Sequence, residues 1–378
     1  MAAVREASPA GSGLVVLDDF FPNLLTGFRV AEFVHYLRAL PGLRVVSTNP
    51  DPIHYRQLAE LYPDVADRVS PYGQTSLDSA RAAWIVFLNN VHHWLDELER
   101  RSLPFIFTLY PGGGFHLNDP VSDEKLNAVL ASPLLKSVIV TQPVALNLLR
   151  GKNCPAPIFN LPGVVVSPDL VRASEPRPPR SPELPLRICF AAFRYDKAGR
   201  NKGYPQFVDA AAIIAEKHPA TRFAVAGDLT PQDYALPDIL AGRIAFHGPL
   251  PTEDLQRFFR QQDVIVSPSR RYAQSRKDFD GFPSGTCVEA ALSGAAMLSS
   301  DELKQNRYYV DGQDILISVP DANAIVETLD PYLKQPERLA ALAERGRART
   351  IELYSEAAQL APRMCLLRDL ARAAGVSV

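Results

Sequence analysis

The sequence predicts an α/β protein with two doubly wound, Rossmann-like domains that face a central cleft. Short apolar runs alternate with segments of helical length in both halves of the 378-residue chain. This alternation is typical of a parallel sheet covered by helices on both faces. A proline-rich, charged stretch without periodicity separates the two series. A chain of this length also exceeds what one hydrophobic core usually serves, so two domains are expected.

The first series predicts an N-terminal domain over residues 1–166. Its strands fall where β-branched and aromatic residues cluster between turn residues. The amphipathic stretches 28–40 and 92–101 predict two of its helices. The predicted strands are residues 14–17, 43–47, 84–88, 105–109 and 138–141.

The stretch 167–186 is interpreted as a linker, stiffened by the restricted φ angles of its prolines. The second series predicts a C-terminal domain over 187–354, followed by a helical tail, 355–378, that is able to pack back on the N-terminal domain. Because open α/β sheets bind ligands beyond the carboxyl ends of their strands, we expect a ligand in the cleft between the domains. The predicted strands are residues 187–193, 222–227, 243–247, 263–267, 295–299 and 314–319, and the clearest helices are 204–217, 253–262 and 285–292.

Composition excludes several classes of protein. The net charge of −2, without a basic run, gives no electrostatic footprint for nucleic acid. The first residues lack the apolar core of a signal peptide, and no run of about 18 apolar residues predicts a membrane span. The cysteines lie far apart without metal-ligand spacing, so we expect free, buried thiols in a reducing cytoplasm. They are Cys154, Cys189, Cys287 and Cys365.

The most informative segment is 280–301, where small residues lead into the helix predicted at 285–292. Small residues let a phosphate approach the backbone, and the free N–H groups and dipole of a helix start favour an anion. Glu289 follows close enough to accept hydrogen bonds from a ribose diol, so the segment suits a nucleoside diphosphate. A capped helix with a surface glutamate is the alternative. The small residues are Gly281, Ser284, Gly285 and Thr286.

The order of motifs over 187–354 resembles the retaining family 4 glycosyltransferases, which have the GT-B fold. Their donor signature is a proline–serine pair, an acidic-Gly-Phe turn, and a helix that carries Glu-Ala and ends in a small residue and glycine. This chain has Pro268 with Ser269, Asp280 with Gly281 and Phe282, Glu289 with Ala290, and Ser293 with Gly294. Two features depart from the pattern. Eight residues separate Asp280 from Glu289 where the family has seven, and the segment between Ser269 and Asp280 carries an insertion rich in Arg and Lys.

The resemblance implies roles for the two carboxylates. Glu289 would hold the ribose, and Asp280 would contact the transferred sugar, with backbone amides at 284–286 making part of that contact. Gly227 matches a glycine turn at which relatives touch the donor through the backbone, and an ordinary turn is the alternative.

The resemblance also implies that two basic side chains neutralise the leaving diphosphate. They belong to the loop 190–203, where relatives have an arginine followed by Lys-Gly. The matches are Arg194 and Lys202. Lys197 and Arg200 compete for this role because the loop is longer than usual, and a solvated basic loop is the alternative.

The acceptor side is expected in the N-terminal domain. Gly27 remains of a Gly-Gly loop that relatives place against the donor phosphate. His116 matches a histidine that relatives place near the transferred sugar. Three consecutive glycines follow the strand 105–109; such a run costs entropy and lets the backbone approach a substrate or the facing domain. They are Gly112, Gly113 and Gly114. A flexible surface loop is the alternative for this stretch.

Together these residues predict a glycosyltransferase that moves a sugar from a nucleotide diphosphate sugar to a glycan or lipid-linked acceptor with retention of configuration. The resemblance implies bacterial surface polysaccharide assembly and at most a peripheral contact with the inner face of the inner membrane. No Asp-x-Asp motif ends a suitable strand, so no metal or other cofactor is expected, and the nucleotide sugar is a co-substrate. A dehydrogenase would need a G-x-G-x-x-G turn, into which neither 14–19 nor 187–193 leads. A non-catalytic GT-B protein that binds a nucleotide sugar is the remaining alternative.

Overall fold

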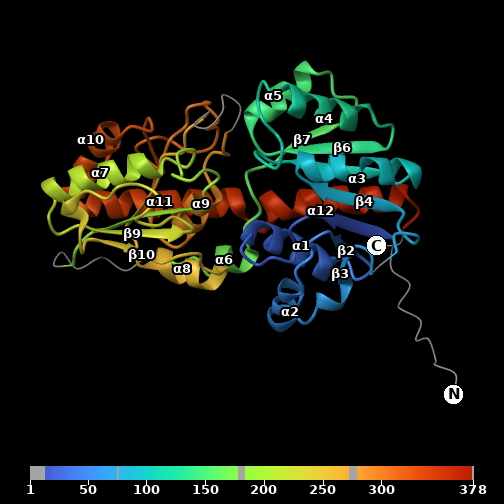
Figure 1. Ribbon diagram of the computed structural model, residues 1–378, viewed down its shortest axis with the longest axis horizontal. Coiled ribbons are helices and arrows are strands. Elements are labelled where there is room, and N and C mark those ends of the chain that lie inside the picture. Colours follow the sequence, from blue (N-terminus) through green and yellow to red (C-terminus); the bar gives the residue numbers. More distant parts are fainter. Residues whose placement is uncertain (1–12, 75, 178–183, 272–278, 377–378) are drawn as a thin grey trace.

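The computed structural model describes residues 13–74, 76–177, 184–271 and 279–376. It has two α/β domains, each built on a parallel sheet with helices on both faces (Figure 1). The order of the strands is β3-β2-β1-β4-β5-β6-β7 in the first sheet and β10-β9-β8-β11-β12-β13 in the second. The predicted fold class, two doubly wound domains, is confirmed.

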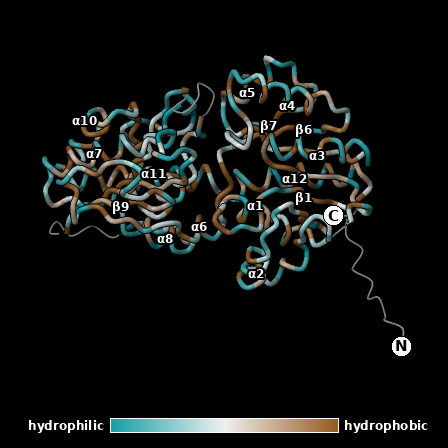
Figure 2. Tube along the Cα trace, viewed as in Figure 1, coloured by the Kyte–Doolittle hydropathy of each residue, from teal (hydrophilic) through white to brown (hydrophobic). Residues whose placement is uncertain are grey.

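The N-terminal sheet is nearly fully buried, as a parallel sheet covered on both faces should be. All five residues of β1, β4 and β5 are buried, and brown, apolar segments run through the interior of the domain in Figure 2. Its strands are β1 (Leu14–Asp18), β2 (Arg44–Ser47), β3 (Val69–Pro71), β4 (Ala82–Val86), β5 (Phe105–Leu109), β6 (Leu135–Val140) and β7 (Ile158–Asn160). Its helices are α1 (Gly27–Ala39), α2 (Pro52–Leu61), α3 (Leu88–Arg100), α4 (Pro120–Ala131) and α5 (Pro143–Gly151), with a 3₁₀ turn at Ala66–Arg68.

Two predictions for this domain were incomplete. The three-residue edge strands β3 and β7 were not predicted, and the strand predicted at 84–88 ends earlier, because α3 already begins at Leu88. Phe87, between the two elements, has a φ of +70° and turns the chain sharply out of the sheet.

The C-terminal domain follows the prediction closely. Helices α7 (Tyr204–Lys217) and α9 (Gly285–Leu292) occupy the predicted residues. The strands are β8 (Arg187–Ala192), β9 (Arg222–Gly227), β10 (Ile244–Phe246), β11 (Val264–Ser267), β12 (Ala296–Ser299) and β13 (Leu316–Ile317). The other helices are α8 (Thr252–Arg260), α10 (Ala322–Leu333) and α11 (Pro336–Tyr354), with a 3₁₀ turn at Asp238–Leu240.

The chain crosses between the domains twice. The first crossing is the proline-rich segment expected to be irregular, and it contains a short helix, α6 (Pro168–Arg172), that starts on a proline. The second crossing lies between α11 and α12 (Glu356–Ala373), and α12 lies on the N-terminal domain (Figure 1). Gln359 of α12 joins the two crossings, because its amide donates to the Val166 carbonyl (2.8 Å) and accepts from the Val166 N–H (2.9 Å).

A buried charge cluster fastens α12 to the N-terminal domain. Arg363 of α12 and Glu32 of α1 are fully buried, with 3.8 Å between the Arg363 Nε and the Glu32 Oε1. The hydroxyls of Tyr36 and Tyr110 donate to the same carboxylate at 2.7 and 3.2 Å. Burial raises the pKa of Glu32, against the opposing charge of Arg363. Removing either partner would therefore leave an uncompensated charge in the core.

The cysteines only partly match the expectation of buried thiols. All four are free; Cys189 and Cys287 are buried, but Cys154 is half-buried and Cys365 is exposed on α12. None of the helices in the described residues has the length and apolarity to cross a membrane.

Candidate active site

The start of α9 is arranged to receive an anion. Ser284 caps the helix, since its Oγ accepts from the Cys287 N–H at 3.4 Å, and its hydroxyl also lies 3.2 Å from the Ser267 Oγ and 3.1 Å from the Thr286 Oγ1. Within the described residues, the N–H groups of Gly285 and Thr286 donate no hydrogen bond. These amides and the helix dipole favour a negatively charged group in front of them.

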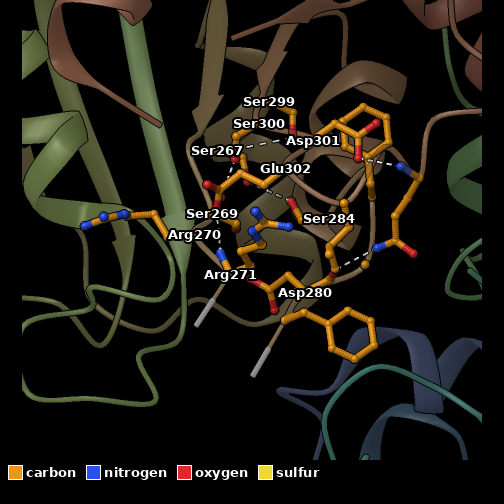
Figure 3. Close-up of a pocket in the computed structure, with 15 residues that line it drawn as sticks. Ser267, Ser269, Arg270, Arg271, Asp280, Ser284, Ser299, Ser300, Asp301 and Glu302 are labelled. Atoms are coloured by element: carbon orange, nitrogen blue, oxygen red, sulfur yellow. Dashed lines mark hydrogen bonds between the residues drawn. The ribbon is translucent and has the colours of Figure 1, made fainter. Parts of the chain in front are cut away.

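Serines line the space behind this helix start. In Figure 3, Ser267, Ser299 and Ser300 lie together, Asp280 lies on the opposite side of the pocket, and Arg270 extends away from it. The free space among these side chains is about 30 Å³, which suits one water molecule. A larger ligand therefore has to approach from the side of Asp280 and the domain interface.

Glu289, on the second turn of α9, is half-buried and has an unsatisfied carboxylate. Its Oε2 is fully enclosed and has no hydrogen-bond partner among the described residues. Burial raises the pKa of this carboxyl from 4.5 to about 7. A Cβ at Gly27 would lie 3.6 Å from the Glu289 Oε1 and 3.5 Å from the Thr252 Oγ1. The start of α1 therefore faces the carboxylate across the domain interface.

Ion pairs fix the segment that carries Gly27. Arg29, in the first turn of α1, lies 3.5 Å from the Asp18 carboxylate at the end of β1 and 3.0 Å from Asp19. Burial raises the pKa of Asp18 to about 6, although the positive charge of Arg29 opposes the shift. The Arg29 charge is thus compensated inside its own domain.

Lys202 and Asp280 form a mostly buried ion pair, with 2.6 Å between the Nζ and the Oδ1. The Nζ also lies 4.4 Å from the centroid of the Tyr195 ring. Burial by itself lowers the pKa of Lys202, but the charge of Asp280 and the contact with Tyr195 outweigh it, and the net shift is upward. The lysine is therefore charged when a ligand arrives.

The loop before α7 is packed tightly against the proline–serine pair. Gly203 has a φ of +75°, and a Cβ there would lie 1.9 Å from the Pro268 carbonyl oxygen, so only glycine fits. The Arg270 N–H donates to the Asn201 carbonyl at 2.8 Å. The two motifs that carried the family resemblance are thus in direct contact. The Arg- and Lys-rich insertion falls mainly on 272–278, outside the described residues.

The structure separates the four cations of this loop. Lys202 points to Asp280, whereas Lys197 and Arg200 are exposed. Arg194 lies apart, in ion pairs with Asp228 and Asp233.

A second cavity, of about 160 Å³, lies between the domains next to the ion pair. Three polar atoms of its lining residues are enclosed and have no hydrogen-bond partner among the described residues. They are the Nδ1 of His116, the Oδ1 of Asn201 and the Oδ2 of Asp280. The complete lining is Gly112, Gly113 and His116 from the N-terminal domain and Tyr195, Asn201, Arg270, Phe279 and Asp280 from the C-terminal domain.

Packing inside the protein explains three of the predicted site glycines. A Cβ at Gly113 would lie 2.4 Å from the Phe87 ring, and one at Gly114 would lie 2.0 Å from the Asn89 Oδ1. Gly114 does not line the cavity, and Gly112 does. Gly227 has a φ of +114°, and its Cβ would lie 1.9 Å from the Ala192 carbonyl oxygen, so the pairing of β8 with β9 requires it. A ligand is not needed to account for Gly113, Gly114 or Gly227.

Sequence reasoning missed four residues at this interface. The Phe282 N–H donates to the Oε1 of Gln142 at 3.2 Å, and a Cβ at Gly281 would lie 2.9 Å from the Gln142 Nε2. Phe279 packs its ring on Phe115, with 5.5 Å between the centroids. The others are Tyr195 and Asn201. Gln142 follows the carboxyl end of a predicted strand and Asn201 precedes the Lys-Gly pair, which are the signals that could have identified them.

The described part of the chain contains no group of three or more His, Cys, Asp or Glu side chains placed to hold a metal ion. The carboxylates of the site are instead paired with a lysine or left without a partner.

Residues 205–362 match the sequence model of a family described as glycosyl transferase-like. No curated protein matches the sequence. Among solved structures, the chain is similar to sucrose-phosphate synthase from Thermosynechococcus elongatus, with a TM-score of 0.64 and 19% identity over 95% of this chain and 99% of that one. It is also similar to Anabaena HepE in complex with UDP, with a TM-score of 0.67 and 14% identity over 96% and 99% of the chains. A Rickettsia africae glycosyltransferase has a TM-score of 0.68 and 14% identity over 94% and 98% of the chains.

These structural similarities extend over nearly the whole of both chains in each comparison. The chain therefore has the same two-domain architecture as these structures, the GT-B fold. At identities below 20% the similarity establishes the fold. The sequence match covers most of the C-terminal domain, including α9 and Asp280, and ends within α12; Lys202 lies just before its first residue.

Proposed function

We propose that this chain, which has the GT-B fold and matches the glycosyl transferase-like family over residues 205–362, is a glycosyltransferase that uses a nucleoside diphosphate sugar as donor. One observation carries the proposal. Three residues that line the interdomain cavity have an enclosed polar atom without a partner in the described part of the chain, and the mostly buried Lys202 pairs with one of them, Asp280. Asp280 also lines the pocket at the start of α9, where the amides are free. Buried polar atoms are normally hydrogen-bonded, so these mark where a polar ligand sits.

The donor occupies three adjoining places in this proposal. The hydroxyls of its ribose donate hydrogen bonds to the carboxylate of Glu289, opposite Gly27. Its diphosphate accepts hydrogen bonds from the amides of Gly285 and Thr286 and lies near the Lys202 ammonium group. The transferred sugar enters the cavity beside Asp280. Arg194 contributes a second positive charge at the loop after β8, although Asp228 and Asp233 already compensate it.

The reaction transfers the sugar with retention of its anomeric configuration. The bond from the sugar C1 to the oxygen of the β-phosphate breaks, and its electron pair stays on the diphosphate. The acceptor hydroxyl oxygen forms the new bond to C1 on the same face, and its proton passes to the departing phosphate oxygen. Lys202 and the α9 amides stabilise the charge that develops on the diphosphate, which is the largest contribution expected from such a site.

This charge stabilisation by the protein's own groups supports a reaction without a metal ion. We therefore expect turnover to persist after exhaustive treatment with EDTA and to be unchanged by added Mg²⁺. A requirement for a divalent cation would contradict this part of the proposal. The acceptor is proposed to be a glycan or lipid-linked glycan of a bacterial cell surface, reached from the cytoplasm.

A screen of nucleoside diphosphates by thermal shift tests the donor site. HepE was solved with UDP and with UDP-glucose, so uridine diphosphate is the first candidate, followed by the guanosine, adenosine and thymidine forms. At about 100 times its Kd, a ligand stabilises the fold by roughly 2.7 kcal/mol. Glu289→Ala should abolish most of the shift from the preferred nucleotide. No shift with any nucleotide, or an unchanged shift in the variant, would contradict the proposal.

A non-catalytic nucleotide-sugar-binding protein is the second candidate. Its support is that the two cations matched to the family are already compensated by protein carboxylates, Lys202 by Asp280 and Arg194 by Asp228 and Asp233. Incubation with the preferred nucleotide sugar separates the two functions. Release of free nucleoside diphosphate, by transfer or by slow hydrolysis, identifies the enzyme, and tight binding without release identifies the binding protein.

A further inference from the structure

We propose that Asn201 determines which sugar this protein accepts, by hydrogen bonding one hydroxyl of the sugar ring in the 160 Å³ cavity. The inference rests on the proposed function and adds a residue that neither the family resemblance nor the sequence match assigns. It follows from the size of the cavity, the position of the Asn201 amide and the polar groups around it.

The cavity has room for one ring. Its volume of about 160 Å³ is close to that of engineered protein cavities of roughly 150 Å³, which admit benzene, also a six-membered ring. A single pyranose ring therefore fills it, and an oligosaccharide does not fit inside. Asp280 lines the cavity and pairs with Lys202, which lies near the diphosphate in the proposed function, so the ring that enters is the one attached to the diphosphate.

The backbone of Asn201 is fixed and its side chain is enclosed before any sugar arrives. The residue is only 4% exposed, and its Oδ1 is enclosed without a partner among the described residues. Its backbone is fixed on both sides, because its N–H donates to the Asp196 carboxylate at 3.2 Å and its carbonyl accepts from the Arg270 N–H at 2.8 Å. Asp196 also accepts from the N–H groups of Ala198 and Arg200, at 2.8 and 3.1 Å.

Besides Asn201, the side chains of His116, Tyr195, Arg270 and Asp280 line the cavity and are able to bond a hydroxyl. The aromatic rings of Tyr195 and Phe279 and the backbone of Gly112 and Gly113 form much of the wall. Three of the lining residues carry an enclosed atom without a partner in the described part of the chain, namely the His116 Nδ1, the Asn201 Oδ1 and the Asp280 Oδ2. Such atoms discriminate between sugars, because a sugar that lacks the matching hydroxyl leaves a buried group unpaired.

The chemistry of the side chain separates its role from catalysis. A carboxamide neither carries charge nor transfers a proton near neutral pH, so Asn201 is assigned to recognition. Asp280, by contrast, binds Lys202 through its Oδ1 and has its Oδ2 free for the sugar. Substitution of Asn201 should therefore change the choice among sugars and leave binding of the nucleotide alone unaffected.

The test combines variants of Asn201 with sugars that lack one hydroxyl. Donors based on the nucleotide sugar that the wild-type protein turns over best are prepared with a single deoxy position each, and kcat/KM is measured for wild type, Asn201→Ala and Asn201→Ser. In wild type, one deoxy donor should lose about ten- to a hundredfold in kcat/KM relative to its parent. With the parent donor, kcat/KM of Asn201→Ala should be lower than that of wild type by a similar factor. In this variant, removal of that same hydroxyl from the donor should lower kcat/KM by less than about twofold further.

Controls separate recognition from loop structure. Asn323→Ala, which truncates an exposed asparagine at the start of α10 in the same domain, should retain the wild-type pattern with every donor. Asn201→Ala and Asn201→Ser should bind the free nucleoside diphosphate as wild type does. Equal sensitivity to every deoxy position in wild type and variant would overturn the inference, and so would a parallel loss of nucleotide affinity. If wild type neither binds nor turns over any nucleotide sugar, the proposed function fails and the inference fails with it.

Discussion

Replacement of Glu289 by glutamine should make the protein more stable at alkaline pH while weakening its binding of nucleotide. Glu289 has a fully enclosed Oε2 without a partner in the described part of the chain, and burial raises the pKa of its carboxyl from 4.5 to about 7. The folded protein therefore keeps a proton at Glu289 in a pH range where the unfolded chain has already lost it. Stability from this group is complete below pH 4.5 and is lost as the pH rises through 7.

The size of the loss follows from the shift. Each pKa unit corresponds to ~1.4 kcal/mol, so the free energy of unfolding of wild type should fall by roughly 3 kcal/mol from this carboxyl alone between pH 4.5 and 8. Glutamine does not ionise, so the Glu289→Gln variant should escape this loss. The difference in the free energy of unfolding between variant and wild type should therefore increase with pH and level off above 8.

Urea unfolding of both proteins at half-unit steps from pH 5 to 8.5 measures the difference directly. The exposed Glu327→Gln on α10 serves as a control for the amide substitution itself. In the same samples, Glu289→Gln should bind the preferred nucleoside diphosphate more weakly than wild type at pH 8, because an ionised carboxylate is the better acceptor for ribose hydroxyls. A difference in stability that stays constant over the whole pH range would refute the reasoning.

Three further substitutions test other parts of the structure. Gly113→Ala should lower the free energy of unfolding by at least about 1–2 kcal/mol in urea titrations, because alanine is strained at a φ of +53° and its Cβ collides with Phe87. An unchanged urea midpoint of unfolding would contradict the described conformation of this loop. Arg363→Met should lower the free energy of unfolding by about 3–5 kcal/mol, because Glu32 stays buried without its cation, and adding Glu32→Gln to the same chain should restore part of this loss. If the losses of the two substitutions were additive, the pairing of the two residues would be contradicted. Lys202→Ala should lower kcat by about 10²–10³ in steady-state assays with little change in affinity for uncharged nucleoside; equal loss of nucleoside binding would argue against a phosphate role.

The sequence predicted best those elements whose pattern is local. Helix α7 begins after a glycine, has a proline in its first turn and buries one continuous apolar face, and the predicted range 204–217 is the observed one. The edge strands β3 and β7 have three residues each, too few to show an alternating pattern, and depend on the neighbouring strands for their pairing. Short elements of this kind are defined by the sheet and not by their own residues.

The candidate site was predicted in part, and the gaps have a common physical cause. Lys202, Asp280 and His116 were selected from motifs, but the atoms that complete the cavity come from residues far apart in sequence, such as Phe279 against Phe115. Only the packing of one domain on the other reveals them. The predictions from glycines failed for a related reason. A glycine indicates that another group approaches the backbone closely, but the sequence does not show which group it is. For Gly227 it is the Ala192 carbonyl of the adjacent strand.

The position of α12 has a consequence for how the polypeptide matures. Leu360, Met364 and Leu367 are fully or almost fully buried in the core of the N-terminal domain, yet they are translated after the whole C-terminal domain. Until they emerge from the ribosome, the first domain has an uncovered apolar surface and Glu32 lacks its cation. The N-terminal domain is therefore completed last although it is synthesised first, and a chain that ended after residue 354 would have two linked domains of which only the second is complete.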